Sequence, residues 1–119
     1  MNLHEIIERF TLVSGFDRQE VSRYLTLIRD CVAVFEEKLT REPSAGEKRR
    51  LSHACAVYAY YRISMMLRDG GLQSFKAGDV QFAVDNDCAA ATRMWEAERA
   101  MIADLVSFDD SFAFRSVDV

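Results

Sequence analysis

The sequence is poor in proline and has no long apolar run. Only one of its 119 residues is proline, while 50% are hydrophobic and 29% are charged, a mixture typical of ordered globular domains. A chain of this length can bury roughly two-thirds of its unfolded surface in one core. The sequence therefore predicts a single domain, residues 1–119, that folds without a disulfide framework or a structural metal.

The sequence also lacks a basic excess, and its first residues, MNLHEIIERF, do not show a basic segment followed by an apolar run, so we expect neither a targeting leader nor a membrane span. Its 15 Lys and Arg residues are outnumbered by 19 Asp and Glu residues, which gives a net charge of −4. Direct binding to nucleic-acid phosphates requires a concentrated basic face instead. No window approaches the roughly 20 apolar residues that cross a bilayer. We therefore expect a protein made in the cytoplasm that has no membrane partner and does not bind nucleic acid directly.

Motifs for catalysis, phosphate binding and metal binding are equally scarce. The cysteines Cys31, Cys55 and Cys88 lie far apart, and no CxxC or CxxH pair exists. His4 and His53 are isolated from each other and from any nucleophile signature. The glycines form neither GxGxxG nor GxxxxGK. We therefore expect no enzyme activity, no cofactor and no metal, and we interpret the cysteines as reduced core residues.

Two charged clusters stand out without forming a motif. Asp109 and Asp110 are candidates for binding a divalent ion, although neighbouring acids on a tail are usually a solvated turn. Lys48, Arg49 and Arg50 occupy the first turn of a predicted helix, which is usually a solvated face. Cations at that end oppose the helix dipole and so favour an acidic neighbour.

Apolar residues at three- and four-residue spacing predict a mainly α protein. The expected helices cover residues 3–13, 17–41, 44–69 and 85–105. Asp17 with Glu20, and Ser44 with Glu47, match the capping-box signature at two helix starts. Pro43 separates the second helix from the third because proline disfavours a helical conformation in the residue before it.

The third predicted helix is apolar on most of its circumference. It carries three tyrosines and two methionines, which are Tyr58, Tyr60, Tyr61, Met65 and Met66. A helix with so wide an apolar surface must be covered on two sides. It is either the central helix of a bundle or packs in part on another subunit.

The stretch 72–84, LQSFKAGDVQFAV, interrupts the helical pattern. It follows Gly70 and Gly71, and residues 80–83 alternate between apolar and polar side chains, which is the period of a strand. We therefore expect an extended β-like arm between the last two helices. The unpaired backbone groups of such an arm favour pairing with a second polypeptide.

The C-terminal residues 107–119, SFDDSFAFRSVDV, form a second alternating segment. Phe112 and Phe114 would be costly to leave in water, so the segment folds back on the domain or docks on a neighbour. We expect it to be β-like and to pair with residues 80–84. The full expectation is a four-helix bundle-like domain with an extended β-like arm and a short β-like C-terminal tail.

Along the chain follow a helical hairpin, a glycine stop, the segment SFKAGDVQF, a capped helix and a tail containing FAFRSV. This order resembles the head-tail connector (head completion or adaptor) proteins of long-tailed phages and prophages. The residues that carry the resemblance are Ser74, Phe75, Lys76, Ala77, Gly78, Asp79 and Val80. Residues 56–61 and 112–115 add support, so that the resemblance spans roughly residues 44–117. The sequence departs from the family after Asp79, where Gln81, Phe82 and Ala83 replace small polar residues alternating with valine.

The resemblance implies a structural subunit of a ring that joins the portal to the tail and lets DNA pass. Its partners would be further copies of the chain, the portal protein and tail-completion proteins, with DNA only as cargo in the lumen. The chain would be made in the bacterial host cytoplasm and end in the virion. The expected interface residues are Phe75, Lys76, Gly78, Asp79, Val80, Phe82, Val84, Phe112 and Phe114. The alternative is a free-standing helical interaction or regulatory module that dimerises through its third helix.

Overall fold

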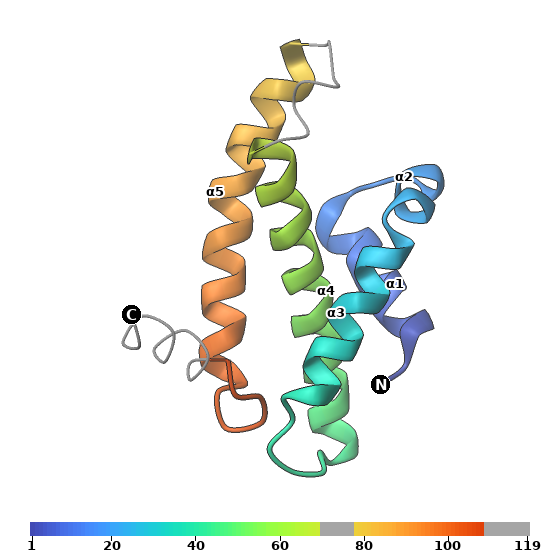
Figure 1. Ribbon diagram of the computed structural model, residues 1–119, viewed down its shortest axis with the longest axis vertical. Coiled ribbons are helices and arrows are strands. Elements are labelled where there is room, and N and C mark those ends of the chain that lie inside the picture. Colours follow the sequence, from blue (N-terminus) through green and yellow to red (C-terminus); the bar gives the residue numbers. More distant parts are fainter. Residues whose placement is uncertain (70–77, 109–119) are drawn as a thin grey trace.

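A long hairpin of two antiparallel helices dominates the computed structural model (Figure 1). The structure describes residues 1–69 and 78–108, and the side chains of residues 1–68 and 89–108. The helices of the described part are α1 (Leu3–Ser14), α2 (Arg18–Arg23), α3 (Leu25–Glu37), α4 (Ala45–Asp69) and α5 (Gly78–Met101). The expected mainly α class is confirmed. No helix in the described ranges is both long enough and apolar enough to cross a bilayer.

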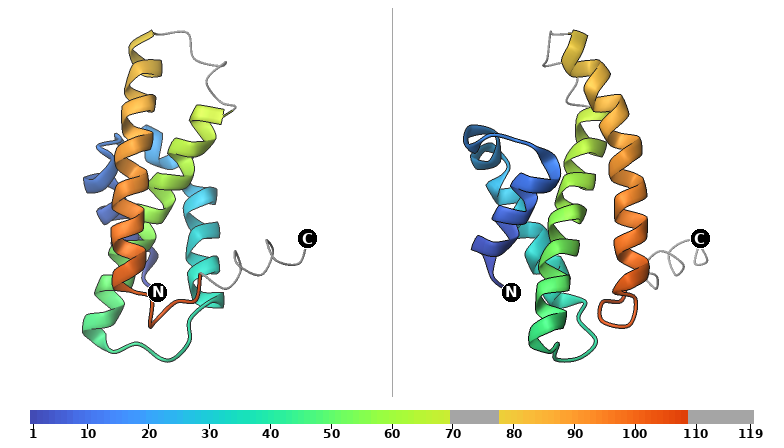
Figure 2. Two further views of the ribbon diagram at one scale, coloured as in Figure 1. Left: turned by 90° about the vertical axis from the view of Figure 1, so that its left-hand side faces the viewer. Right: turned by 180° about the vertical axis from the view of Figure 1, so that it is seen from behind.

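Helix α4 is the centre of the fold. It contacts α1 and α3 on one side and α5 on the other, as the two views of Figure 2 show. Every side chain from Leu51 to Ser64 is buried or partly buried. Ala54, Ala56 and Ala59 are fully buried, and their small side chains allow neighbouring helices to approach closely. From Leu51 to Ser64 the wide apolar surface predicted for this helix therefore packs largely inside its own subunit, whereas Met66 is 46% exposed.

The turn between α1 and α2 is fixed by a glycine and an aromatic side chain. Gly15 has a φ of 73°, a left-handed conformation that glycine adopts without steric cost, and its N–H donates to the carbonyl oxygen of Thr11 at 2.9 Å. The ring of Phe16 then meets Phe10 edge-on at 5.6 Å and Tyr60 of α4 at 6.3 Å between centroids. This turn anchors the N-terminal helices against α4.

The helix predicted over residues 17–41 is divided in two. Its capping box is confirmed, since Glu20 N–H donates to Asp17 at 2.9 Å and Asp17 N–H donates to Glu20 at 3.0 Å. The helix then breaks at Tyr24, whose φ of −101° and ψ of 13° leave the regular α-helical range. The Tyr24 ring lies 5.9 Å from the ring of Phe16, so a tertiary contact accompanies the break. The prediction of a single long helix was therefore wrong. Helix α3 also ends at Glu37, before the predicted end at residue 41.

The second capping box is confirmed and is extended by an arginine. Ser44 N–H donates to Glu47 at 2.9 Å, and Glu47 N–H donates to the Ser44 hydroxyl at 3.3 Å. Arg41 binds both Glu47 carboxylate oxygens at 2.9 Å and reaches Asp104, beyond α5, at 3.4 Å. The Arg41 guanidinium and the Ser44 N–H lower the pKa of Glu47 from 4.5 to about 2. Arg41 thereby links the start of α4 to the segment that follows α5.

The Glu47 carboxylate makes a pH-dependent contribution to stability. Because its pKa is lower in the folded chain than in the unfolded chain, this contribution is fully present above pH 4.5 and is lost as the pH falls toward about 2. Glu47→Gln should therefore lower the melting temperature at neutral pH, and the difference from the wild type should shrink over that window. Thermal unfolding of both proteins followed by circular dichroism measures this difference. A difference that stays constant through the acid range would contradict the assignment.

After α5 the chain turns back to pair with the end of α3. Leu39 and Val106 form an isolated antiparallel bridge, in which Thr40 N–H donates to Leu105 at 2.9 Å and Ser107 N–H donates to Lys38 at 3.0 Å. This bridge brings Phe108 back onto the bundle. The last helix was predicted to continue to residue 105, and this boundary was wrong because α5 ends at Met101.

The prediction of an extended arm is wrong for the residues of the arm that the structure describes, 78–84. Five of the expected interface residues lie at the start of α5, namely Gly78, Asp79, Val80, Phe82 and Val84. Alternation over only four residues does not distinguish a strand from a helix, and Val80 and Val84 also have helical spacing. Asp79 in the first turn suits the positive end of the helix dipole. The remainder of the arm, with Phe75 and Lys76, lies outside the described residues.

The expected β-like tail also lies outside the described residues. It includes Phe112 and Phe114, and its pairing with residues 80–84 was proposed for two extended segments. Residues 80–84 are helical, so they cannot supply the strand that this pairing requires.

Candidate functional site

Five aromatic rings from three helices and the segment after α5 meet on one side of the bundle. They are Phe35 of α3, Tyr58 and Tyr61 of α4, Trp95 of α5, and Phe108. The Tyr58 centroid lies 4.7 Å from Trp95 and 5.4 Å from Phe108, and Phe108 lies 5.2 Å from Trp95. Phe35 is fully buried beneath them, whereas Tyr58 and Tyr61 are partly exposed. The rings thus fasten α3, α4 and α5 together and also reach the surface.

A groove of about 370 Å³ opens above these rings, between α4 and α5. We call it the aromatic groove. Its apolar surface comes from Tyr58, Tyr61, Met65, Trp95 and Phe108. Its charged side chains are Arg62 from α4 and Glu96 and Arg99 from α5. An aromatic surface beside two guanidinium groups and one carboxylate favours a ligand that combines an apolar group with negative charge.

Arg62 connects the groove to the interior. Its guanidinium carbon lies 5.8 Å from the centre of the Tyr58 ring, and its side chain hydrogen-bonds the Cys31 thiol. Burial raises the pKa of Cys31 to about 11, although Arg62 offsets part of the rise. Burial also raises the pKa of Tyr58. Both groups are therefore neutral at physiological pH, and Cys31 is not a thiolate nucleophile.

The cysteine interpretation is confirmed for the two side chains that the structure describes. Cys31 and Cys55 are buried free thiols, and burial also raises the pKa of Cys55. The two histidines stand apart, with His4 beside Glu8 at 3.4 Å and His53 beside Glu98 at 3.9 Å. Within the described ranges, no three His, Cys, Asp or Glu side chains gather in a way that could hold a metal ion.

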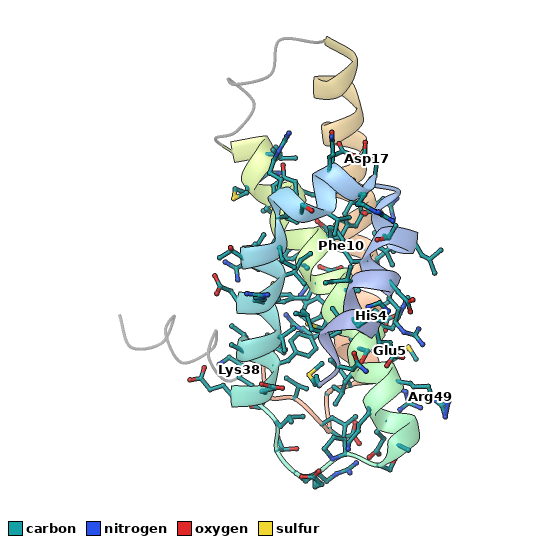
Figure 3. All side chains as sticks on the ribbon, turned by 90° about the vertical axis from the view of Figure 1, so that its right-hand side faces the viewer. His4, Glu5, Phe10, Asp17, Lys38 and Arg49 are labelled. Atoms are coloured by element: carbon teal, nitrogen blue, oxygen red, sulfur yellow. The ribbon has the colours of Figure 1, made fainter. Side chains whose placement is uncertain are left out.

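The basic first turn of α4 is solvated. Lys48, Arg49 and Arg50 are all exposed, and Figure 3 shows Arg49 at the lower end of α4, directed away from the body. The same view shows Phe10 among the side chains packed between α1 and α4. The acidic pair Asp109 and Asp110 lies outside the described residues.

The structure places the described part of the predicted interface at one end of the hairpin. The first turns of α5 extend past the end of α4 and past α1, α2 and α3 (Figures 1 and 2). We call residues 78–84 the tip. The backbone of these residues is helical, so the strand geometry assumed for the predicted interface does not apply to them.

Sequence reasoning missed the aromatic groove because it considered Tyr58 and Tyr61 only as bundle core or as a contact with another subunit. A usable signal was present in the spacing. Arg62 follows Tyr58 by four residues and Arg99 follows Trp95 by four residues, so each helix places an arginine one turn beyond an aromatic ring. No local pattern shows that the two helices face each other there or that Phe108 folds back between them.

Comparisons with protein-family models, with curated proteins and with solved structures found no match to this chain.

Proposed function

We propose that this chain is a structural subunit of a head-tail connector ring of a long-tailed phage or prophage. The observation that supports this best is the projecting tip, because it presents residues that carry the family resemblance beyond the rest of the body (Figure 1). The joining is geometrical, since a subunit of this kind works by binding its neighbours in a fixed orientation.

The helical form of the tip suits contacts on two sides. In a closed ring each subunit binds one neighbour through one surface and the other neighbour through a different surface. The sequence of the tip includes the apolar residues Val80, Phe82 and Val84. A projecting helix of this kind can contact two adjacent copies, or one copy and the portal protein.

The remaining partners follow from the same proposal. The ring contacts the portal protein on one side and tail-completion proteins on the other, and it is part of the virion after assembly. DNA passes through the lumen as cargo. The net charge of −4 suits this role, because acidic walls repel phosphate and do not hold the moving duplex.

The burial of α4 favours this proposal over a regulator that dimerises through the same helix. From Leu51 to Ser64 the helix is already covered by α1, α3 and α5. A dimer through this surface would have to open the bundle and expose residues such as Ile63 and Val57, which are fully buried. Outside this stretch, the N-terminal end of α4 is mostly polar, and its C-terminal end exposes Met66.

The proposal is tested by mixing the purified chain with the portal protein from the same genome. We expect the chain to bind the portal as a ring, visible by negative-stain electron microscopy and as a single large species in multi-angle light scattering. A control mixture contains an unrelated portal protein, which should not bind. A chain that forms a stable dimer at every concentration and does not bind its own portal would contradict the proposal.

A further inference from the structure

The aromatic groove is a hollow at the surface of the bundle. Its volume of about 370 Å³ is at the lower end of the range for small ligand sites, and it is lined by partly exposed Tyr58 and Tyr61. A second hollow of about 360 Å³ adjoins it along α5 and shares Glu96 and Arg99 with it. The two hollows form a continuous surface. It has aromatic side chains at one end, and the Arg99 guanidinium group lies where the two hollows meet.

We propose that the aromatic groove is the docking site for the chain's own C-terminal residues 109–119, with Phe112 or Phe114 packed on its aromatic rings. The inference concerns a single subunit, and it holds whether or not the chain forms a ring. Three observations lead to this occupant in particular.

The first observation is the place where the described chain ends. Phe108 is itself part of the groove wall and contacts Tyr58, Trp95 and Phe35. Residues 109–119 therefore start at the groove. Eleven residues can span at most about 36 Å, so Phe112 and Phe114 are well within reach of both hollows.

The second observation is complementary chemistry. Residues 109–119 include two phenylalanines and three aspartates with only one arginine. The groove supplies aromatic rings together with Arg62 and Arg99 against Glu96. Burying one phenylalanine side chain contributes about 1.5–3 kcal/mol by transfer from water, and aromatic contacts add to this.

The third observation is the covalent connection. A segment tethered next to its site has an effective concentration in the millimolar range for a short flexible linker. A second copy or a foreign peptide must compete with that concentration from free solution. The chain's own residues are therefore the favoured occupant of the groove.

Trp95 gives a direct readout, because it is the single tryptophan of the chain and its indole N–H produces one peak in a nitrogen-proton correlation spectrum. In the full-length chain carrying both Phe112→Ala and Phe114→Ala, this peak should move away from its wild-type position. The pair Ser111→Ala and Ser116→Ala changes the same segment without removing a ring and should leave the peak in place. The pair Phe112→Leu and Phe114→Leu keeps apolar volume and should also move the peak, because it removes the ring-current effect.

Added peptide then identifies the occupant. A synthetic peptide of residues 109–119 should return the Trp95 peak of the double alanine variant toward its wild-type position. The same peptide should bind about two- to five-fold more weakly when Arg99→Gln is added, as expected for a solvent-exposed charge pair. A peptide lacking both phenylalanine rings should not bind.

Three results would overturn the proposal. A Trp95 peak that does not respond to the loss of both rings, while the other peaks show a folded chain, would mean that the segment does not occupy the groove. Unlabelled wild-type chain at micromolar concentration could restore the peak of the labelled double variant, which would assign the groove to a second copy. Failure of the peptide to bind the double variant at millimolar concentration would exclude the segment as a ligand of this surface.

Discussion

Replacing Phe35 with alanine should lower the free energy of unfolding by about 3–5 kcal/mol, the usual cost of removing a buried aromatic ring. Phe35 is fully buried and lies where α3, α4 and the segment after α5 meet. Its ring centroid is 5.3 Å from Phe108 and 6.1 Å from Trp95. Removing it leaves a cavity beneath the aromatic groove that the rigid helices cannot close. Urea unfolding followed by circular dichroism measures the loss.

A matched change on the surface serves as the control. Leu12 on α1 is 82% exposed, so Leu12→Ala should alter the free energy of unfolding by no more than about 0.5 kcal/mol. Phe35→Leu keeps most of the apolar volume and should fall between the two. If Phe35→Ala were as mild as Leu12→Ala, the aromatic rings would not be holding the three helices together.

Local signals predicted the parts of this fold that depend on neighbouring residues in sequence. The capping boxes at Asp17 and Ser44 appear as expected, because each needs only a short polar side chain and a glutamate three residues later. The central position of α4 was also among the predictions, because a helix that is apolar on most sides must be covered on most sides.

The errors lie where tertiary contacts or short patterns decide the outcome. Nothing local marks the break at Tyr24, which has neither glycine nor proline beside it and whose ring packs on Phe16. The start of α5 was missed because the period-two pattern at Val80 was too short to identify a strand.

The candidate site was the feature of the structure that was hardest to predict from the sequence. The bridge between Leu39 and Val106 joins residues 67 positions apart and returns Phe108 to the bundle. Without that return the aromatic groove has no end wall, and residues 109–119 do not begin beside it. Periodicity assigns a side chain to a face, but it does not say which two faces of different helices form a groove.

The substitution Phe82→Glu should abolish ring assembly on the portal while leaving the subunit folded. Phe82 belongs to the first turns of α5, which extend past the end of α4 (Figure 1), and the circular dichroism of the variant checks that the subunit stays folded. A glutamate close to the helix N-terminus also suits the helix dipole. An unpaired charge buried in an interface costs about 3–5 kcal/mol, which corresponds to a hundred-fold or greater loss of affinity. Light scattering of the variant mixed with the portal measures this loss.

Gln81→Glu is the control for the effect of added charge alone. It introduces the same charge one position earlier in the same helix turn, at a residue that is already polar. If apolar contact through the tip drives assembly, Gln81→Glu should retain rings and Phe82→Glu should lose them, with equal helical circular dichroism. Loss of rings in both variants would instead indicate general charge repulsion, and rings in both would place the joining surface elsewhere on the subunit. The pair therefore tests whether the projecting end of α5 binds a neighbour through a specific side chain.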